Sequence, residues 1–287
     1  MAKLDKTLRA VETISPRHVE QKVDALLRGI YLDRSHLDYP DRLLAHRFHM
    51  YAQNEEDGLV LALIQEAGRP VGRFVDIGCG HNGGNSAFLA RELLFAGVMI
   101  DGDPDLTILC ETVLGRSDVS VVTAFITQEN INDLIVGGGV QGEIDFLSID
   151  IDGNDLWIWR AIDVVQPRIV CVEYNSLYGA EAAVTIPYDP EFARRSPTIP
   201  PVVKPHYYGA SLRAFVNVGR RDGYRLVSVE PRGTNAFFVR EDVASHVPEI
   251  SVERGFTMLT KNRKRMLAGI DIMEAARRAG LTLEAVL

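Results

Sequence analysis

The chain has 287 residues, 46% of them hydrophobic, which suits one large α/β domain better than two small ones. Its 31 basic and 39 acidic residues give a net charge of −8 without a dense basic block, so nucleic acid and membranes are not expected as partners. Cys79, Cys110 and Cys171 show neither C-x-x-C spacing nor a disulfide framework. With no signal-peptide core and no apolar run of ~20 residues, we expect a soluble cytoplasmic protein with reduced thiols.

The first fifty residues are predicted to form a helical extension. Ser15 and Pro16 are typical of an N-cap followed by proline at the first helical position. Apolar residues then recur at helical spacing, namely Val19, Val23, Leu26, Leu27 and Ile30. A second helical segment is expected from Asp41 to Tyr51. Such an extension would cover an active site, form a homodimer interface or simply extend the packing.

The segment from Phe74 to Pro104 predicts a β-α-β unit. An apolar strand leads into a glycine-rich turn, an amphipathic stretch follows, and a second apolar strand ends at Asp101. Gly78 and Gly80 can adopt positive φ and let a ligand approach the backbone where a Cβ would clash. The turn therefore predicts the floor of a site for a nucleotide-like cofactor.

Two cofactor classes fit this turn. Gly78, Gly80 and Gly83 match the dinucleotide pattern G-x-G-x-x-G. Asp101 lies 23 residues beyond Gly78, near the ~20 expected for a ribose-binding acid. Asp76 instead favours S-adenosylmethionine, because a carboxylate at the strand tip repels a pyrophosphate but attracts an ammonium and a sulfonium. A third interpretation is an ordinary turn whose glycines serve packing.

Strands and helices keep alternating beyond this unit, as in a doubly wound sheet. Helices are predicted before Gly68 and over Leu106–Leu114, 130–135, Ala210–Arg220 and Ile270–Leu287, and strands over Val119–Phe125, 145–150, 168–175, 223–230 and 235–240. The last two strands would close the sheet with an antiparallel edge. We therefore predict an α/β, Rossmann-like, doubly wound seven-stranded sheet over 51–245, with helical additions at 1–50 and 246–287.

Polar residues follow the fourth and fifth predicted strands. Asp150, Asp152 and Asp155 come after a buried strand, where three carboxylates are costly unless a cation, donors or water satisfies them. Ligands bind at the carboxyl ends of strands in open α/β sheets, so Asp150 and Asp152 are candidate site residues. Asp155 is expected in the first turn of a helix. Helix capping and solvated turn carboxylates are the alternative interpretation.

These strand ends leave two chemistries open. A hard-oxygen set of the kind that Mg²⁺ accepts would consist of Asp150, Asp152, Glu173 and Asn175. The same side chains would instead hydrogen-bond a substrate, with Glu173 as a general base.

Residues 176–210 interrupt the alternation with a proline-rich stretch. A loop this long in a compact enzyme is usually functional or disordered, and we expect a substrate lid. His206 is a candidate general base, because its ordinary pKa of ~6.5 suits proton transfer near neutrality. The alternative is that His206 only forms hydrogen bonds within the loop. Tyr178, Tyr207 and Tyr208 would line an aromatic acceptor pocket.

Four ordered motifs resemble those of class I S-adenosylmethionine-dependent methyltransferases, and within them the FkbM-like group. They are Val75–Gly80, Ile100–Pro104, Ser148–Gly153 and Val172–Asn175, and the resemblance covers roughly residues 51–240. It implies methyl transfer to a small-molecule acceptor, most simply a hydroxyl, in natural-product or sugar modification. Asp152 departs from the pattern, because many FkbM-like members have Glu before the glycine.

The resemblance also implies how the cofactor is bound. Asp76, Gly78 and Gly80 would hold its methionine part, with Asp150 facing the same end. Asp101 would bind the ribose hydroxyls.

The adenine would be bordered by Ala124 and Phe125, at the end of the third strand. Further cofactor contacts are expected from Gln53, Asn85, Gly102 and Asp103. Other functions stay open: N- or C-methyl transfer, a nicotinamide-dependent oxidoreductase using the same glycine pattern, and a cofactor-binding partner without turnover.

Overall fold

A computed structural model describes residues 23, 35–115, 117–194, 196, 199–201, 203–257, 263–264, 268–269 and 271–287. Apart from Val23, the helix predicted around residues 16–30 lies outside these ranges. No helix within them is long and apolar enough to cross a bilayer.

The chain divides into two compact units that interleave along the sequence. Unit 1 comprises Met1–Ile126, Asn132–Ser148 and Asp163–Ile169, and unit 2 comprises Thr127–Ile131, Ile149–Ile162 and Val170–Leu287. The expected division into 1–50, 51–245 and 246–287 stays a prediction.

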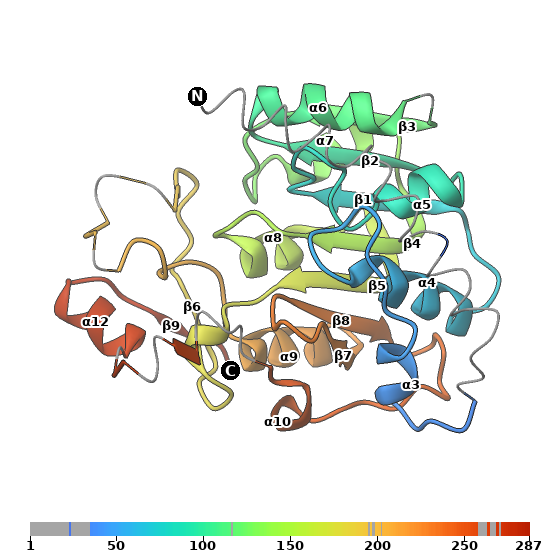
Figure 1. Ribbon diagram of the computed structural model, residues 1–287. Helices are drawn as coiled ribbons and strands as arrows, with labels where there is room; N and C mark the ends of the chain where they lie inside the picture. The colour runs from blue at the N-terminus through green and yellow to red at the C-terminus, as the bar shows by residue number, and fades with distance from the viewer. Residues whose placement is uncertain are drawn as a thin grey trace. The chain divides into compact units, whose positions relative to one another are not determined.

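Seven strands form one sheet in the order β3-β2-β1-β4-β5-β8-β7 (Figure 1). Their bounds are Arg73–Ile77 (β1), Ala96–Asp101 (β2), Val119–Thr123 (β3), Gly142–Ile149 (β4), Val165–Glu173 (β5), Tyr224–Val229 (β7) and Asn235–Arg240 (β8). β2 pairs in parallel with β1 and β3, whereas β7 and β8 are antiparallel. The chain runs outward from β1 to β3 and returns beside β1 with β4, which is the strand-order reversal of a doubly wound sheet. The predicted fold class is confirmed.

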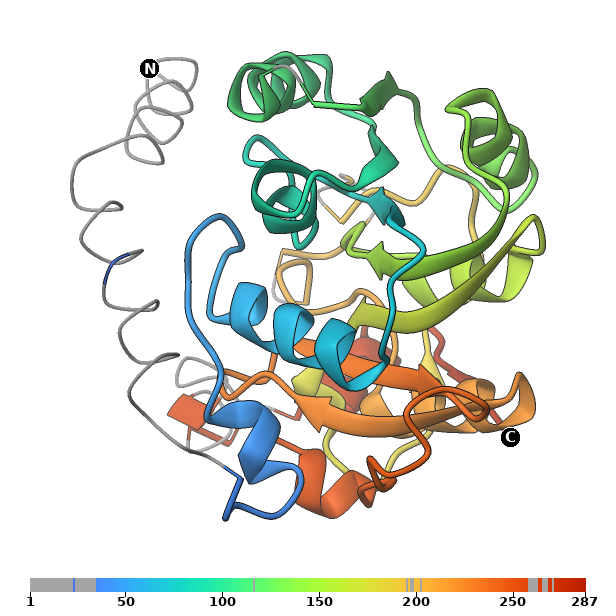
Figure 2. The same ribbon diagram turned by 90° about the vertical axis from the view of Figure 1, so that its right-hand side faces the viewer.

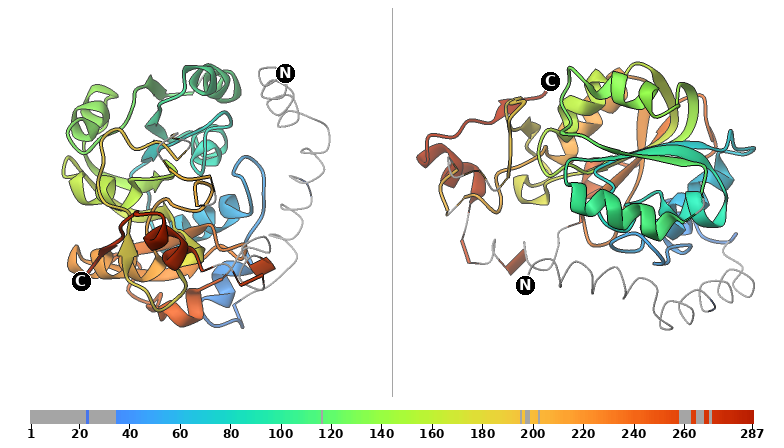
Figure 3. Two further views of the ribbon diagram at one scale, coloured as in Figure 1. Left: turned by 90° about the vertical axis from the view of Figure 1, so that its left-hand side faces the viewer. Right: turned by 90° about the horizontal axis from the view of Figure 1, so that it is seen from above.

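In unit 1, helices cover both faces of the parallel strands. α6 (Pro104–Leu114) and α7 (Ile131–Gly137) lie on opposite faces (Figure 3). The packing is close: a Cβ on Gly138, after α7, would lie 2.3 Å from Val98 Cγ2 of β2. α5 (Ala87–Glu92) follows the glycine-rich turn.

The chain before β1 is less helical than expected. α3 (Asp41–Leu44) packs beside α4 (Glu56–Glu66) (Figure 2), and the predicted helix over Asp41–Tyr51 ends after its first turn. After α3 the N–H groups of His46 and Arg47 form only three-residue turn bonds, and further along the Asp57 carboxylate accepts the backbone N–H groups of residues 50–52. The N–H groups of residues 50–52 are therefore not available to continue a helix up to Tyr51.

Unit 2 has an aromatic core around Trp159 of α8 (Asp155–Ala161). Its ring centroid lies 6.1, 5.8 and 5.1 Å from those of Phe215, Tyr224 and Phe238. Phe215 belongs to α9 (Leu212–Arg221), which packs on β7, and α10 (Val252–Gly255) lies near both. Trp159 thus serves packing.

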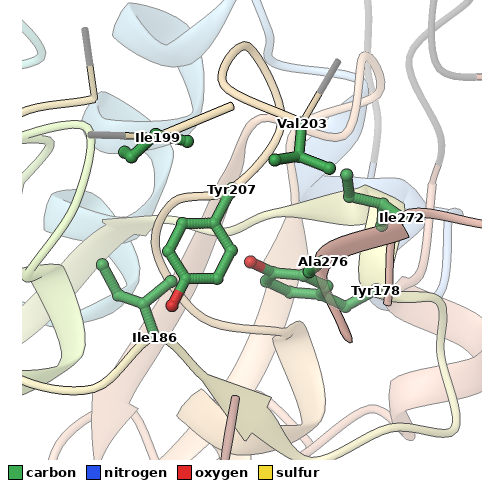
Figure 4. Close-up of a cluster of buried hydrophobic side chains, with 7 residues drawn as sticks. All are labelled: Tyr178, Ile186, Ile199, Val203, Tyr207, Ile272 and Ala276. Atoms are coloured by element: carbon green, nitrogen blue, oxygen red, sulfur yellow. The ribbon is translucent and has the colours of Figure 1, made fainter. Parts of the chain in front are cut away.

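The segment 176–210 has a hydrophobic core of its own within unit 2. Side chains of this segment are buried with α12 (Ile272–Arg278) in a cluster made of Tyr178, Ile186, Ile199, Val203, Tyr207, Ile272 and Ala276 (Figure 4). The segment contains a 3₁₀ turn, η1 (Ser176–Tyr178), and β6 (Val184–Thr185), which pairs with β9 (Glu284–Ala285).

The helix predicted over Ile270–Leu287 is shorter than expected. α12 ends at Arg278, and Gly280 has a φ of 73°, a conformation that terminates helices. The chain then turns and pairs with β6.

Candidate functional site

The glycine-rich turn of unit 1 is fixed to the end of β2. Gly78 and Gly80 have φ values of 88° and 59°, the left-handed region that favours glycine, as the sequence predicts. The Gly78 N–H donates to the Ile100 carbonyl at 2.8 Å, and the Gly80 N–H donates to Asp101 Oδ2 at 2.9 Å. Asp101 therefore shapes the turn as well as standing at its edge.

Asp76, on β1, lies against this turn. Its side chain is 1% exposed, and a Cβ on Gly84 would lie 2.8 Å from Asp76 Oδ1. Asp76 Oδ2 is buried and has no hydrogen-bond partner among the described residues. Burial, with a smaller contribution from Asp101, raises the Asp76 pKa to about 7, against interactions with Ser86 that lower it. Such a group calls for a cation or a hydrogen-bond donor.

The ends of β2 and β3 bring together the residues expected at the ribose and adenine. The Ala124 N–H donates to the Asp101 carbonyl at 3.0 Å, and a Cβ on Gly102 would lie 3.7 Å from the Ala124 carbonyl oxygen. Phe125 follows with 55% of its side chain exposed. Asp101, Gly102, Ala124 and Phe125 thus form one small shelf.

Three further predicted cofactor residues have different surroundings. Asn85 is buried, and its Nδ2 donates to Ser148 Oγ at 3.1 Å. Asp103 caps α6 by accepting the Asp105 N–H at 2.9 Å. Gln53 is exposed just before α4. Asp103 therefore has a helix-capping role, whatever else it contacts.

Sequence reasoning missed Asp57, which lies in α4 with no solvent exposure. Its Oδ2 accepts the N–H groups of three consecutive residues, Met50 at 2.6 Å, Tyr51 at 2.7 Å and Ala52 at 3.1 Å. The Tyr51 carbonyl in turn accepts a hydrogen bond from Asn82 Nδ2 in the glycine-rich turn. The only sequence signal was an acidic residue in the first turn of a helix, which is ordinarily a simple dipole effect.

In unit 2, Glu173 at the end of β5 is the centre of a second acidic group. The residue is partly exposed, yet its Oε2 is buried and accepts no hydrogen bond from any residue that the structure describes. Burial raises the Glu173 pKa well above its ordinary value, and the carboxylates of Asp150, Asp152 and Asp155 raise it further, whereas Arg194 opposes them. Burial, together with crowding among like charges, thus makes the Glu173 carboxylate bind a proton more tightly than an ordinary glutamate.

Arg194 lies beside this acidic group as a cation, and no sequence motif pointed to it. Its guanidinium forms an ion pair with Asp152, donates from Nη2 to the Pro205 carbonyl at 3.0 Å and stands 3.7 Å over the Tyr208 ring. The positive φ of Asp152, 57°, belongs to the turn that follows β4. Segment 176–210 therefore supplies both a charge and an aromatic ring to the acidic group.

The turn after β4 is held by Asp155 and covered by Phe192. Asp155 Oδ1 accepts the Ile151 N–H at 2.8 Å and Oδ2 accepts the Gly153 N–H at 2.9 Å, in the first turn of α8 as predicted. A Cβ on Gly153 would lie 2.5 Å from the Phe192 ring, so glycine is needed for this contact.

Asn175 has a structural role that the sequence did not suggest. Its Nδ2 donates to the carbonyls of His206 at 2.8 Å and Tyr208 at 3.0 Å, and its Oδ1 accepts the Leu177 N–H at 3.1 Å. Asn175 therefore caps η1 and fixes the backbone around His206. His206 itself is 7% exposed, in the turn before Tyr208.

These residues do not fit the predicted Mg²⁺ set. The Asn175 amide oxygen is engaged by a backbone donor, and Asp152 is paired with Arg194. Within the described ranges, no three His, Cys, Asp or Glu side chains are arranged to hold a metal ion. The magnesium interpretation of Asp150, Asp152, Glu173 and Asn175 is therefore not supported.

Comparisons with known proteins give only distant likenesses. No protein-family model and no curated protein matches this chain. Among solved structures, it aligns with an O-methyltransferase from Bacillus cereus in complex with SAH at 14% identity and a TM-score of 0.42, over 78% of this chain and 89% of that one. The O-methyltransferase TomG from Streptomyces achromogenes, in complex with SAM, gives 16% and 0.44 over 77% and 96%. The SAH-bound Podospora anserina methyltransferase PaMTH1 gives 12% and 0.43 over 79% and 88%. Likeness at this level carries no argument about function, which must be argued from the residues.

Proposed function

We propose that this chain is a class I S-adenosylmethionine-dependent methyltransferase that methylates a small molecule at a hydroxyl oxygen. The observation that carries the proposal is Asp76, a buried carboxylate against a turn of left-handed glycines, with an oxygen that has no hydrogen-bond partner among the described residues. The ammonium of the cofactor's methionine part would satisfy this oxygen, because it is both a cation and a donor. A pyrophosphate would meet repulsion there, which disfavours a dinucleotide.

The residues of unit 1 fit this cofactor. Asp76 with Gly78 and Gly80 would hold the methionine part, and Asp101 would accept hydrogen bonds from the ribose hydroxyls. Each Asp101 oxygen accepts one backbone N–H and keeps further acceptor capacity. The exposed Phe125 ring offers an apolar surface for adenine. The bound cofactor supplies a methyl group on a positively charged sulfur, ready for transfer to a nucleophile.

The residues of unit 2 would act on the acceptor. Glu173 is the proposed general base: its raised pKa makes its ionised form a stronger base than an ordinary glutamate, and the carboxylate of this partly exposed residue would take the hydroxyl proton. His206 is the second candidate, on the segment fixed by Asn175. No step is assigned to a metal ion, because the residues do not fit one.

Two sequence motifs bear on the class of the acceptor molecule. The Val172–Asn175 motif and, apart from Asp152, the Ser148–Gly153 motif support membership of the FkbM-like group, and with it an acceptor from natural-product or sugar chemistry.

The first experiment is calorimetric titration of the purified, metal-stripped protein with S-adenosylhomocysteine, with NADH as the comparison ligand. We expect saturable binding of S-adenosylhomocysteine and no binding of NADH. A second step measures transfer of a labelled methyl group to a panel of alcohols and amines. NADH binding without S-adenosylhomocysteine binding would overturn the proposal in favour of an oxidoreductase, and cofactor binding without transfer to any acceptor would indicate a partner without turnover.

A further inference from the structure

Asp57 controls the backbone of the chain that precedes α4. One of its oxygens accepts three consecutive N–H groups, those of Met50, Tyr51 and Ala52, at 2.6 to 3.1 Å. Hydrogen bonds to an ionised acceptor are stronger than neutral ones, and three that converge on one atom fix the orientation of the peptide planes that donate them. The carboxylate reaches out of its own helix to do this.

The fixed segment continues directly to the glycine-rich turn. The Tyr51 carbonyl accepts a hydrogen bond from Asn82 Nδ2, and Asn82 Oδ1 accepts the Gly84 N–H at 3.4 Å. Gly84 is the residue whose missing Cβ leaves room for the Asp76 carboxylate. All of these residues belong to unit 1, and hydrogen bonds connect Asp57 through Tyr51 and Asn82 to Gly84, which lies against Asp76.

The side chain of Tyr51 fixes the same segment from the opposite direction. Its hydroxyl donates to Glu92 Oε1 at 2.6 Å, and its ring is buried in a cluster with Ala87 and Phe88 of α5. The Tyr51 backbone and side chain are thus both restrained, and Asp57 supplies the backbone restraint.

We propose that Asp57 is a positioning residue for the cofactor turn, which it holds in its binding conformation through Tyr51 and Asn82. The inference rests on the proposed function. Replacement of the Asp57 carboxylate by an amide would leave three N–H groups converging on a neutral oxygen that accepts weaker hydrogen bonds, so that residues 50–52 shift and Asn82 loses its oriented carbonyl partner. The turn would then bind the cofactor more weakly, although Asp57 itself makes no contact with it.

The neighbouring Glu56 provides a matched control. It is equally buried and lies in the same helical turn, but its carboxylate accepts hydrogen bonds from Asn54, at 2.7 Å from the backbone N and 3.0 Å from Nδ2. No hydrogen bond described above links Asn54 to the glycine-rich turn. Glu56→Gln therefore changes a buried acid of α4 without touching the path through Tyr51.

The test is S-adenosylhomocysteine titration of Asp57→Asn, Asn82→Ala, their double variant and Glu56→Gln, each checked by circular dichroism and thermal unfolding. We expect Asp57→Asn and Asn82→Ala each to weaken binding by about tenfold, the double variant to bind no more weakly than Asn82→Ala alone, and Glu56→Gln to bind like the wild type. Wild-type affinity in Asp57→Asn, or full additivity in the double variant, would overturn the inference.

Hydrogen exchange of the ligand-free protein separates this inference from the proposed function. Asp57→Asn should speed amide exchange at Gly80 and Gly84, and Glu56→Gln should not. If the wild type fails to bind S-adenosylhomocysteine but the exchange result holds, the proposed function fails while the positioning role stands. Unchanged exchange at both glycines in Asp57→Asn would contradict the positioning role itself. Asn82→Ala keeps the question answerable if the Asp57 variant does not fold.

Discussion

Each unit contains an acidic residue with one buried oxygen that has no hydrogen-bond partner among the described residues, but the surroundings of the two residues differ. Around Asp76 in unit 1, the neighbours are glycines and a turn held by hydrogen bonds to Asp101. Around Glu173 in unit 2, the neighbours are other carboxylates, opposed by Arg194. A carboxylate among backbone groups is suited to recognising a cation, whereas a carboxylate crowded by like charges is suited to holding and releasing a proton. Under the proposed function, the same side-chain chemistry would serve cofactor binding in one unit and proton transfer in the other.

The largest expected effect concerns the proposed role of Glu173 in proton transfer. Glu173→Gln keeps the size of the side chain and removes the base, so turnover should fall by about 10²- to 10⁴-fold while S-adenosylhomocysteine affinity stays within about twofold. Steady-state rates and calorimetry measure the two quantities, and the exposed Glu181→Gln serves as the control. Unchanged turnover would remove Glu173 from the reaction and direct attention to His206.

The next largest effect concerns the proposed role of Asp76 in recognising the cofactor. Asp76→Asn removes the charge that would pair with the cofactor's ammonium, so binding should weaken by about a hundredfold. Calorimetry with S-adenosylhomocysteine provides the measurement. Asp133→Asn, an exposed acid of the same unit, should bind normally. Equal affinity in the two variants would show that Asp76 does not contact the ligand.

A smaller effect follows from the Asp76 pKa of about 7 in the ligand-free protein. Pairing with an ammonium lowers the pKa of a carboxyl group, so binding at pH 6 should release close to one proton, and binding at pH 8 almost none. Affinity should therefore rise about tenfold from pH 6 to pH 8. Titrations in buffers of different ionisation enthalpy count the protons, and Asp76→Asn should abolish the dependence. Proton uptake instead of release would contradict the assignment.

The smallest effect concerns Arg194, whose charge opposes the rise of the Glu173 pKa. Arg194→Gln should move the acidic limb of the pH–rate profile upward by less than about one unit, because the ion pair with Asp152 is partly exposed. Cofactor affinity should not change. A downward movement would indicate that Arg194 acts on a different group.

The sequence predicted the sheet well because apolar runs and glycine turns are local signals. Short stretches of chain were enough to predict the strands around Phe74–Ile77 and 235–240, the left-handed conformation of Gly78 and Gly80, and the position of Asp155 in a helix. These features need no knowledge of distant contacts.

The missed features depend on contacts between segments. Asp57 reads as an ordinary helix-start acid until its carboxylate is seen to accept N–H groups of the preceding turn. Arg194 acquires its role only because Tyr208 and Asp152 come to lie beside it. Asn175 has the chemistry of a metal ligand, but three backbone groups occupy its amide. Residue type suggests what a side chain can do, and tertiary placement selects among those possibilities.

The hydrophobic core of segment 176–210 also has a consequence for the order in which parts of the chain fold during synthesis. Tyr178 and Ile186 are synthesised well before Ile272 and Ala276, the side chains that cover them, and β6 is synthesised well before its partner β9. Contacts between such distant segments form more slowly than local contacts, because closing a long loop costs more conformational entropy. During synthesis these apolar side chains therefore lack their packing partners until the C-terminal segment has been made. The segment that carries Arg194 and His206 is expected to be among the last parts of the protein to fold.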